Sequence, residues 1–177
     1  MLQQQAYTTT KTKNNNHPFT YPQYQDNCIS NIPDLIKEIF NINDNPPAKN
    51  LYKHTTQKIF REQNKKVALI IIDGLGYNQF LKQQKKDQLL TDLDNNGIIQ
   101  PLTSVFPSQT TNALTTLNTG LTPQEHGIFE YFLYLKNIGL INSLKCELIN
   151  QKTNNHLTEE KIDPSNLLLK PEFCMFL

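Results

Sequence analysis

The strongest pattern along the chain is an unbroken aliphatic run over Val67–Ile72, which stops abruptly at Asp73 and Gly74. Continuous apolar sequence is typical of a strand covered on both faces, as in the parallel sheets of α/β proteins. The pattern therefore predicts a central strand over 67–72 with Asp73 at its carboxyl end, the edge where open α/β sheets bind ligands. We expect the α/β class: three layers, with a mainly parallel central sheet and helices on both faces.

Apolar residues at helical spacing predict the elements around this strand. Residues 28–40 form a short amphipathic pattern, with Pro33 tolerated in the first turn of a helix. Residues 51–64 predict a polar, exposed helix, and residues 78–94 predict another. Residues 97–102 follow a turn and predict a short second strand.

Thr110 lies at a second transition from extended chain to helix. Ala113, Leu114 and Leu117 share one helical face, and Gly120 offers a C-cap. This pattern predicts a helix from about residue 110 to residue 120, with Thr110 at or near its N-terminus.

The residues after Gly120 predict a short turn of helix and then strands. Thr122 and Glu125 have the spacing of a capping box, and His126-Gly127 ends that turn. Residues 128–149 are apolar and aromatic enough to form further strands.

The two ends of the chain differ from its middle. Residues 1–27 are rich in Gln, Thr, Asn and Tyr without a sustained period, which predicts a disordered or extended N-terminal arm. A linker is predicted over 41–49. Beyond residue 150 the chain is polar until an apolar ending at 172–177 that carries no terminating signal. We therefore expect residues 28–177 to be the N-terminal portion of a catalytic domain that is truncated at its C-terminus.

Composition narrows the class of protein. A chain of 177 residues, 37% hydrophobic and 19% charged, is long enough to form one hydrophobic core. Its formal net charge of +1 provides no overall electrostatic attraction for a nucleic-acid polymer. No apolar stretch predicts a membrane span or a secretory signal, so the expected location is cytoplasmic. The three cysteines are far apart and include no C-x-x-C pair, so neither disulfides nor a zinc ribbon is predicted.

Asp73 and Thr110 are the candidate chemical groups. Each is ordinary alone, because Asp-Gly is a common turn and Thr is a common helix cap. Together they are more informative, because a carboxylate is a hard metal ligand and a metal or a base can convert a Thr hydroxyl into a nucleophile. If both bind one divalent ion, their oxygens can be at most roughly 4 Å apart.

Several segments in order resemble the first half of a type I phosphodiesterase/nucleotide pyrophosphatase of the alkaline phosphatase superfamily. Their order and spacing are more specific than any one of them, and Tyr21–Tyr24 and Asn27–Ile29 are similar to the amino-terminal arm of bacterial members. The segments are Asp73-Gly74, Phe106-Pro107-Ser108-Gln109-Thr110, Thr119-Gly120-Leu121-Thr122-Pro123 and Glu125-His126-Gly127-Ile128.

The resemblance implies an alkaline phosphatase-like fold and metal-dependent phosphoester hydrolysis. Asp73 matches the family's first metal-binding carboxylate, and Thr110 matches the nucleophile that coordinates the same ion. The family mechanism passes through a phosphorylated threonine and uses two divalent ions, usually zinc. The implied partner is a small phosphoester or nucleotide substrate, and the sequence leaves the oligomeric state open.

The sequence also departs from the family pattern. Tyr131 stands where nucleotide pyrophosphatases generally carry an Asn that binds a phosphoryl oxygen, about 21 residues after the nucleophile. The remaining Asp and His ligands come from a carboxyl-terminal half, and neither His156 nor Asp163 lies in a matching motif. His126 is expected to be hydrogen-bonded beside its glycine turn rather than to bind metal.

Three alternatives remain at this point. A superfamily relative with another substrate, such as a phosphomonoesterase or phosphomutase, would keep similar chemistry. A sulfatase would usually need a Cys or Ser converted to formylglycine, and Thr110 is neither. A truncated, non-catalytic or interaction protein would keep two ligands of an incomplete site, and for this reason we expect the chain alone to be inactive or nearly so.

Overall fold

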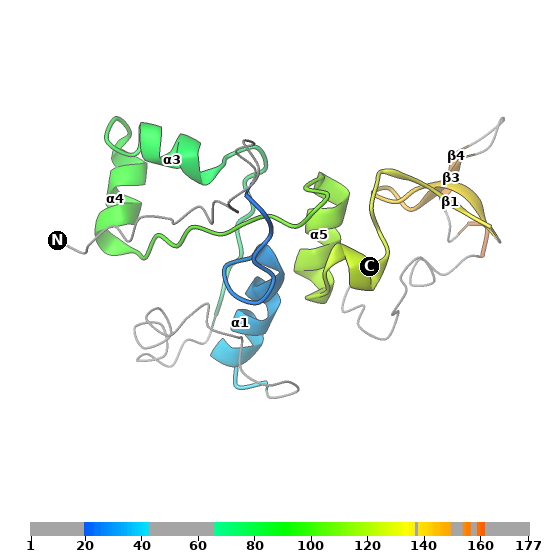
Figure 1. The fold of residues 1–177 in the computed structure, drawn as a ribbon, viewed down its shortest axis with the longest axis horizontal. Coiled ribbons are helices and arrows are strands. Elements are labelled where there is room, and N and C mark those ends of the chain that lie inside the picture. The colour runs from blue at the N-terminus through cyan, green and yellow to red at the C-terminus, as the bar shows by residue number, and fades with distance from the viewer. Residues whose placement is uncertain (1–19, 43–65, 137, 150–153, 157–158, 162–177) are drawn as a thin grey trace, which may run out of the picture.

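The computed structural model describes residues 20–42, 66–136, 138–149, 154–156 and 159–161. Figure 1 shows a small β-sheet at one end of the long axis and a pair of helices, α3 and α4, at the other. Helices α1 and α5 lie between them. Residues 1–19 of the arm predicted over 1–27, most of the linker predicted over 41–49 and the helix predicted over 51–64 lie outside the described residues.

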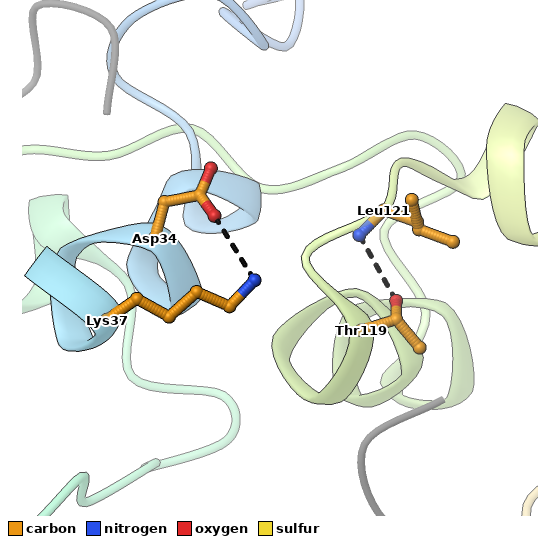
Figure 2. Close-up of polar contacts among 4 residues, drawn as sticks. All are labelled: Asp34, Lys37, Thr119 and Leu121. Carbon is orange, nitrogen blue, oxygen red and sulfur yellow. Dashed lines mark hydrogen bonds and ion pairs between the residues drawn. The ribbon is translucent and has the colours of Figure 1, made fainter. Parts of the chain in front are cut away.

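The first helical segment agrees with its prediction over residues 28–40. A 3-10 turn, η1 (Ile29–Asn31), leads into α1 (Ile32–Ile39) with Pro33 in the first turn, where a missing N–H costs no helical bond. Asp34 and Lys37, one turn apart on α1, form a partly exposed ion pair of 3.7 Å (Figure 2). Helix α1 contacts α5 in the middle of the molecule.

The prediction of a buried strand over 67–72 is wrong for this structure. The segment is extended but belongs to no strand, and its aliphatic side chains are exposed, with Ile70 at 80% and Ile72 at 64%. A continuous apolar run becomes a central strand only when neighbouring strands pair with it and helices cover it. Among the described residues, no strand pairs with this segment and no helix covers it.

Residues 77–96 are helical but form two helices rather than the one predicted over 78–94. Helix α3 (Tyr77–Gln83) and helix α4 (Gln88–Asn96) are separated by a turn. Asp87 starts the second helix, because its carboxylate accepts a 3.1 Å hydrogen bond from the Leu90 N–H. The Gln84 side chain also donates to Asp94, which folds the two helices back on each other.

The short strand predicted over 97–102 is not formed. Instead, Thr103 makes an isolated parallel bridge with Cys28, and this is the single parallel pairing in the described part of the chain. The Ile29 N–H donates to the Thr103 carbonyl at 3.0 Å, and the Thr103 N–H donates to the Asn27 carbonyl at 2.7 Å. This bridge joins the segment before α1 to the segment that leads to α5.

Helix α5 (Thr110–Thr119) confirms the helix predicted after residue 110. It ends at Gly120, whose φ of +74° lies in the left-handed region that a glycine adopts without a Cβ clash. At this end the Leu121 N–H donates to the Thr119 hydroxyl at 3.1 Å (Figure 2). Gly120 was therefore a sufficient signal in the sequence to predict where this helix ends.

The capping box predicted at residues 122–125 is also present. Both the backbone N–H and the hydroxyl of Thr122 donate to the Glu125 carboxylate at 2.9 Å. The short helix that follows, α6 (Pro123–His126), packs against α5.

Four strands form the sheet. Three of them confirm the strands predicted in residues 128–149, and the fourth lies in the polar region beyond residue 150, where no strand was predicted. They are β1 (Phe132–Leu135), β2 (Gly139–Asn142), β3 (Glu147–Ile149) and β4 (Asn154–His156), paired in that order.

Every pairing in this sheet is antiparallel, which corrects the prediction of a mainly parallel central sheet. The connections between the strands are only a few residues long, and parallel strands need crossovers of a dozen residues or more. Ile128 and Ile141 form the buried centre of this end of the molecule. The half-buried hydrophobic residues packed against them are Leu133, Leu135, Ile138, Cys146 and Leu148.

Candidate functional site

The structure brings together the two residues singled out from the sequence. The Thr110 hydroxyl donates a hydrogen bond of 3.2 Å to Asp73 Oδ2, although the residues are 37 positions apart. The distance is within the roughly 4 Å limit for two oxygens on one zinc ion. Asp73 ends the extended segment 67–72 rather than a sheet strand, and Gly74, with a φ of +75°, turns the chain after it.

Helix α5 places Thr110 at its first position. The Ala113 N–H bonds to the Gln109 carbonyl at 2.9 Å, and the Gln109 side chain makes no capping hydrogen bond to the helix. The N–H groups of Thr110, Thr111 and Asn112 therefore have no acceptor within the helix. They point from the positive end of the helix dipole, which favours an anion beside Thr110.

Asn112 fixes the two loops that flank this helix end. Its side chain is fully buried, and its amide donates at 3.0 Å to the carbonyls of Pro107 and Phe129. The loop before α5 also contains a cis Phe106–Pro107 peptide bond. The Phe106 N–H donates to the Tyr24 hydroxyl at 3.0 Å, so the described end of the predicted arm contacts this loop.

Glu130 is a charged group at the site that the sequence analysis missed. The Gln109 amide donates to Glu130 Oε2 at 2.7 Å, and the Tyr131 N–H donates to Glu130 Oε1 at 2.8 Å. Gln109 and Glu130 lie 21 residues apart in unlike segments, so neither periodicity nor a motif could pair them.

Tyr131 stands at the position that the family resemblance associates with a phosphoryl-binding Asn. Its backbone is tied to the end of β2, because the Ser143 N–H donates to the Tyr131 carbonyl at 2.7 Å.

His126 is fully buried and hydrogen-bonded, in agreement with its predicted structural role. Its Nδ1 accepts from the Ile128 N–H at 3.0 Å, so the ring proton of the neutral form is on Nε2, which lies 3.2 Å from the Thr116 hydroxyl. Burial lowers the pKa of His126 to about 4, although the Asn112 backbone and the Glu125 carboxylate act in the opposite direction. The ring is therefore neutral at physiological pH.

The donor set matches part of the shell of one divalent cation. A carboxylate oxygen and a hydroxyl oxygen are hard ligands, and they lie close enough to share an ion. The part of the chain described by the structure contains no group of three or more His, Cys, Asp or Glu side chains suited to hold a metal. His156 lies exposed in β4, and Asp163 lies outside the described residues.

Within the described ranges, no helix is long and apolar enough to cross a membrane.

Comparison with known proteins finds one family. The sequence profile described as Type I phosphodiesterase / nucleotide pyrophosphatase matches residues 67–163, more than half of the chain, and the match includes both Asp73 and Thr110. No significant match is found among curated proteins or among solved structures.

Proposed function

This chain belongs to the type I phosphodiesterase/nucleotide pyrophosphatase family, a family of hydrolases that act on small phosphoester substrates, and from this premise we propose that Thr110 is its nucleophile. The proposed reaction is metal-dependent hydrolysis of a phosphodiester or pyrophosphate. The observation that supports it is the 3.2 Å hydrogen bond from the Thr110 hydroxyl to Asp73 at the N-terminus of α5.

Asp73 and Thr110 are the residues that would hold a divalent cation, for which we propose zinc. A bound cation would favour loss of the Thr110 hydroxyl proton and offset the negative charge of the phosphoryl group. The Asp73 carboxylate contributes independently, because it orients the hydroxyl and can accept its proton.

The proposed first step forms one bond and breaks one. Thr110 Oγ1 attacks phosphorus, its proton passes to the Asp73 carboxylate, and the bond from phosphorus to the leaving oxygen breaks with its electron pair on that oxygen. The leaving alcohol takes a proton from water, or departs as the anion when it is acidic. The N–H groups at the start of α5 that have no acceptor within the helix would face the charge that develops on the phosphoryl oxygens.

The second step would return Thr110 to its free form. A water molecule attacks the same phosphorus, the bond from phosphorus to Thr110 Oγ1 breaks, and the hydroxyl is restored. Among the described residues, no group of three or more His, Cys, Asp or Glu side chains is suited to hold a second ion for this water. We therefore propose that the 177-residue chain forms the covalent adduct slowly and turns over little.

A chromogenic phosphodiester tests this proposal. With bis(p-nitrophenyl) phosphate and added Zn²⁺ or Mn²⁺, we expect release of nitrophenolate to approach one equivalent per chain and then to stop. Thr110→Ala should abolish the release. Thr115→Ala is the matched control, because Thr115 lies in the same helix and, among the described residues, its hydroxyl bonds only to the Thr111 carbonyl.

Two results would contradict the proposal. Release that persists in Thr110→Ala would exclude Thr110 as the nucleophile, and sustained Thr110-dependent turnover would show that the site is complete. The absence of any release, with metal binding intact, would favour the non-catalytic alternative. Turnover of monoesters in preference to diesters would favour a phosphomonoesterase or phosphomutase relative.

A further inference from the structure

We propose that Glu130 is a positioning residue for Thr110, and that it acts through Gln109. The inference rests on the proposed function, because it assumes that the orientation of the Thr110 hydroxyl matters for reaction. Its structural part, that Glu130 determines where Thr110 lies, can be tested without any reaction.

The contact between Glu130 and Gln109 has a defined direction. A carboxylate only accepts hydrogen bonds, so the nitrogen of the Gln109 amide must face Glu130, and the 2.7 Å distance is typical of a charge-assisted bond. This orientation leaves Gln109 Oε1 buried without a partner among the described residues. A buried unpartnered oxygen costs free energy, which the bond to Glu130 helps to offset.

Glu130 is itself anchored to the β-sheet. Its other carboxylate oxygen accepts the Tyr131 N–H, and its backbone carbonyl accepts the Ser143 hydroxyl at 2.6 Å. Ser143 directly follows β2, and Tyr131 directly precedes β1. Glu130 therefore joins the paired ends of two strands to the residue before the proposed nucleophile.

This connection matters because it acts on the residue directly before Thr110. Helix ends fray, Gln109 provides no side-chain cap, and Phe106 and Ser108 in the preceding loop are exposed. Asn112 holds the two flanking loops, but it lies two residues inside the helix. The Gln109–Glu130 bond is the contact that acts next to Thr110 itself.

The first experiment measures the position of Thr110 directly. In the full chain with ¹³C-labelled threonine methyl groups, Thr110→Ala identifies the Thr110 signal by NMR. We expect Gln109→Ala and Glu130→Ala to shift this signal in the same direction and to broaden it. Glu125→Ala is the matched control, because Glu125 accepts two bonds from Thr122 in its own capping box and should leave the Thr110 signal unchanged.

The second experiment measures the rate of adduct formation with bis(p-nitrophenyl) phosphate and Zn²⁺. Misplacing a reacting group by about 1 Å can cost ~100-fold, so we expect Glu130→Ala to slow the reaction about tenfold. Glu130→Gln should slow it less, because an amide oxygen can still accept one of the two bonds. The double variant Gln109→Ala/Glu130→Ala should be no slower than either single variant, because both break the same contact.

The outcomes separate the two proposals. An unchanged Thr110 signal in Glu130→Ala, or effects of the two substitutions that add fully, would overturn the positioning role. A shifted signal without any adduct in the wild-type chain would leave Glu130 as a positioning residue and would contradict the nucleophilic role of Thr110. Equal shifts in Glu125→Ala and Glu130→Ala would show a general loss of structure and would also overturn the inference.

Discussion

Among single residues, buried polar side chains define the surroundings of Thr110. Asn112, Thr116 and His126 are all fully buried, and each is hydrogen-bonded to a residue distant in sequence or in the next loop. Leaving a buried donor or acceptor unpaired costs about 1–3 kcal/mol, so these contacts select one arrangement of α5, α6 and the loop that follows. The site therefore depends on groups that take no part in its chemistry.

Asn112 provides the first test at this scale. Replacing Asn112 by Leu keeps a similar volume but removes both donors, so the carbonyls of Pro107 and Phe129 lose this hydrogen-bond partner. We expect the free energy of unfolding, measured by urea titration, to fall by about 2–4 kcal/mol. Asn118→Leu is the control, because Asn118 is exposed on the same helix and, among the described residues, its side chain bonds only to the Leu114 carbonyl. Equal effects of the two substitutions would contradict this account.

His126 makes stability depend on pH in a defined direction. Its pKa is about 4 in the folded protein against 6.5 when unfolded, so between these values the unfolded chain binds the extra proton. The neutral His126 ring therefore contributes about 3 kcal/mol to the free energy of unfolding. This contribution is fully present above about pH 6.5 and is lost as the pH falls through about pH 4.

Urea titrations across this pH window check the prediction. The wild-type chain should lose stability on acidification more steeply than His126→Asn, whose side-chain oxygen can still accept the Ile128 N–H. If the stability of His126→Asn falls on acidification as steeply as that of the wild-type chain, groups other than His126 cause the pH dependence.

Among the elements, local sequence signals were reliable for helix ends and poor for strand pairing. The end of α5 at Gly120 and the capping box at Thr122 could be predicted because they depend on residues only a few positions apart. The exposure of Val67–Ile72 could not be predicted, because burial of a strand depends on partners distant in sequence. The antiparallel order of β1–β4 follows from short connections rather than from the apolar pattern of any strand.

The same distinction applies to the candidate site. Asp73 and Thr110 stood out because each marks the end or the start of a local element, and the structure places them in contact. The support from Glu130 could not be inferred, because it depends on how the sheet lies against the start of α5. Sequence therefore identified the two candidate groups but not the residue that we propose positions Thr110.

Gly120 tests the prediction of the helix end. Its positive φ is costly for any residue with a Cβ, and an added Cβ would also lie 3.6 Å from the Pro33 side chain, an ordinary contact. We expect Gly120→Ala to lower the free energy of unfolding by about 1–2 kcal/mol from backbone strain alone. Gly120→Asn should cost less, because Asn tolerates this conformation better. A lower midpoint of thermal unfolding for Gly120→Asn than for Gly120→Ala would contradict the explanation by backbone strain.

The exposed aliphatic segment should make the chain self-associate. Val67–Ile72 is extended, lacks charge and belongs to no strand, and these are features of a sequence that pairs with other chains. Sedimentation velocity at rising protein concentration should show larger species, and Ile70→Lys should reduce them. Asn95→Lys adds the same charge on an exposed face of α4 and should not. A wild-type chain that stays monomeric at all concentrations would contradict this expectation.

For the whole molecule, the site lies where separate parts of the chain meet. The extended segment supplies Asp73, helix α5 supplies Thr110, and the sheet supports the helix start through Glu130. Figure 1 shows α5 between the sheet and helices α1, α3 and α4. Reactivity should therefore be sensitive to changes in any of the three.

The central claim is that Thr110 reacts with phosphorus with the help of Asp73. The most direct measurement is tandem mass spectrometry of the chain after incubation with bis(p-nitrophenyl) phosphate and Zn²⁺, which locates the covalent nitrophenyl phosphoryl group. We predict that it is attached to Thr110, that Thr110→Ala abolishes it, and that Asp73→Asn slows its formation while the fold is unchanged. A phosphoryl group on any other residue, or one that forms equally fast in Asp73→Asn, would contradict the claim.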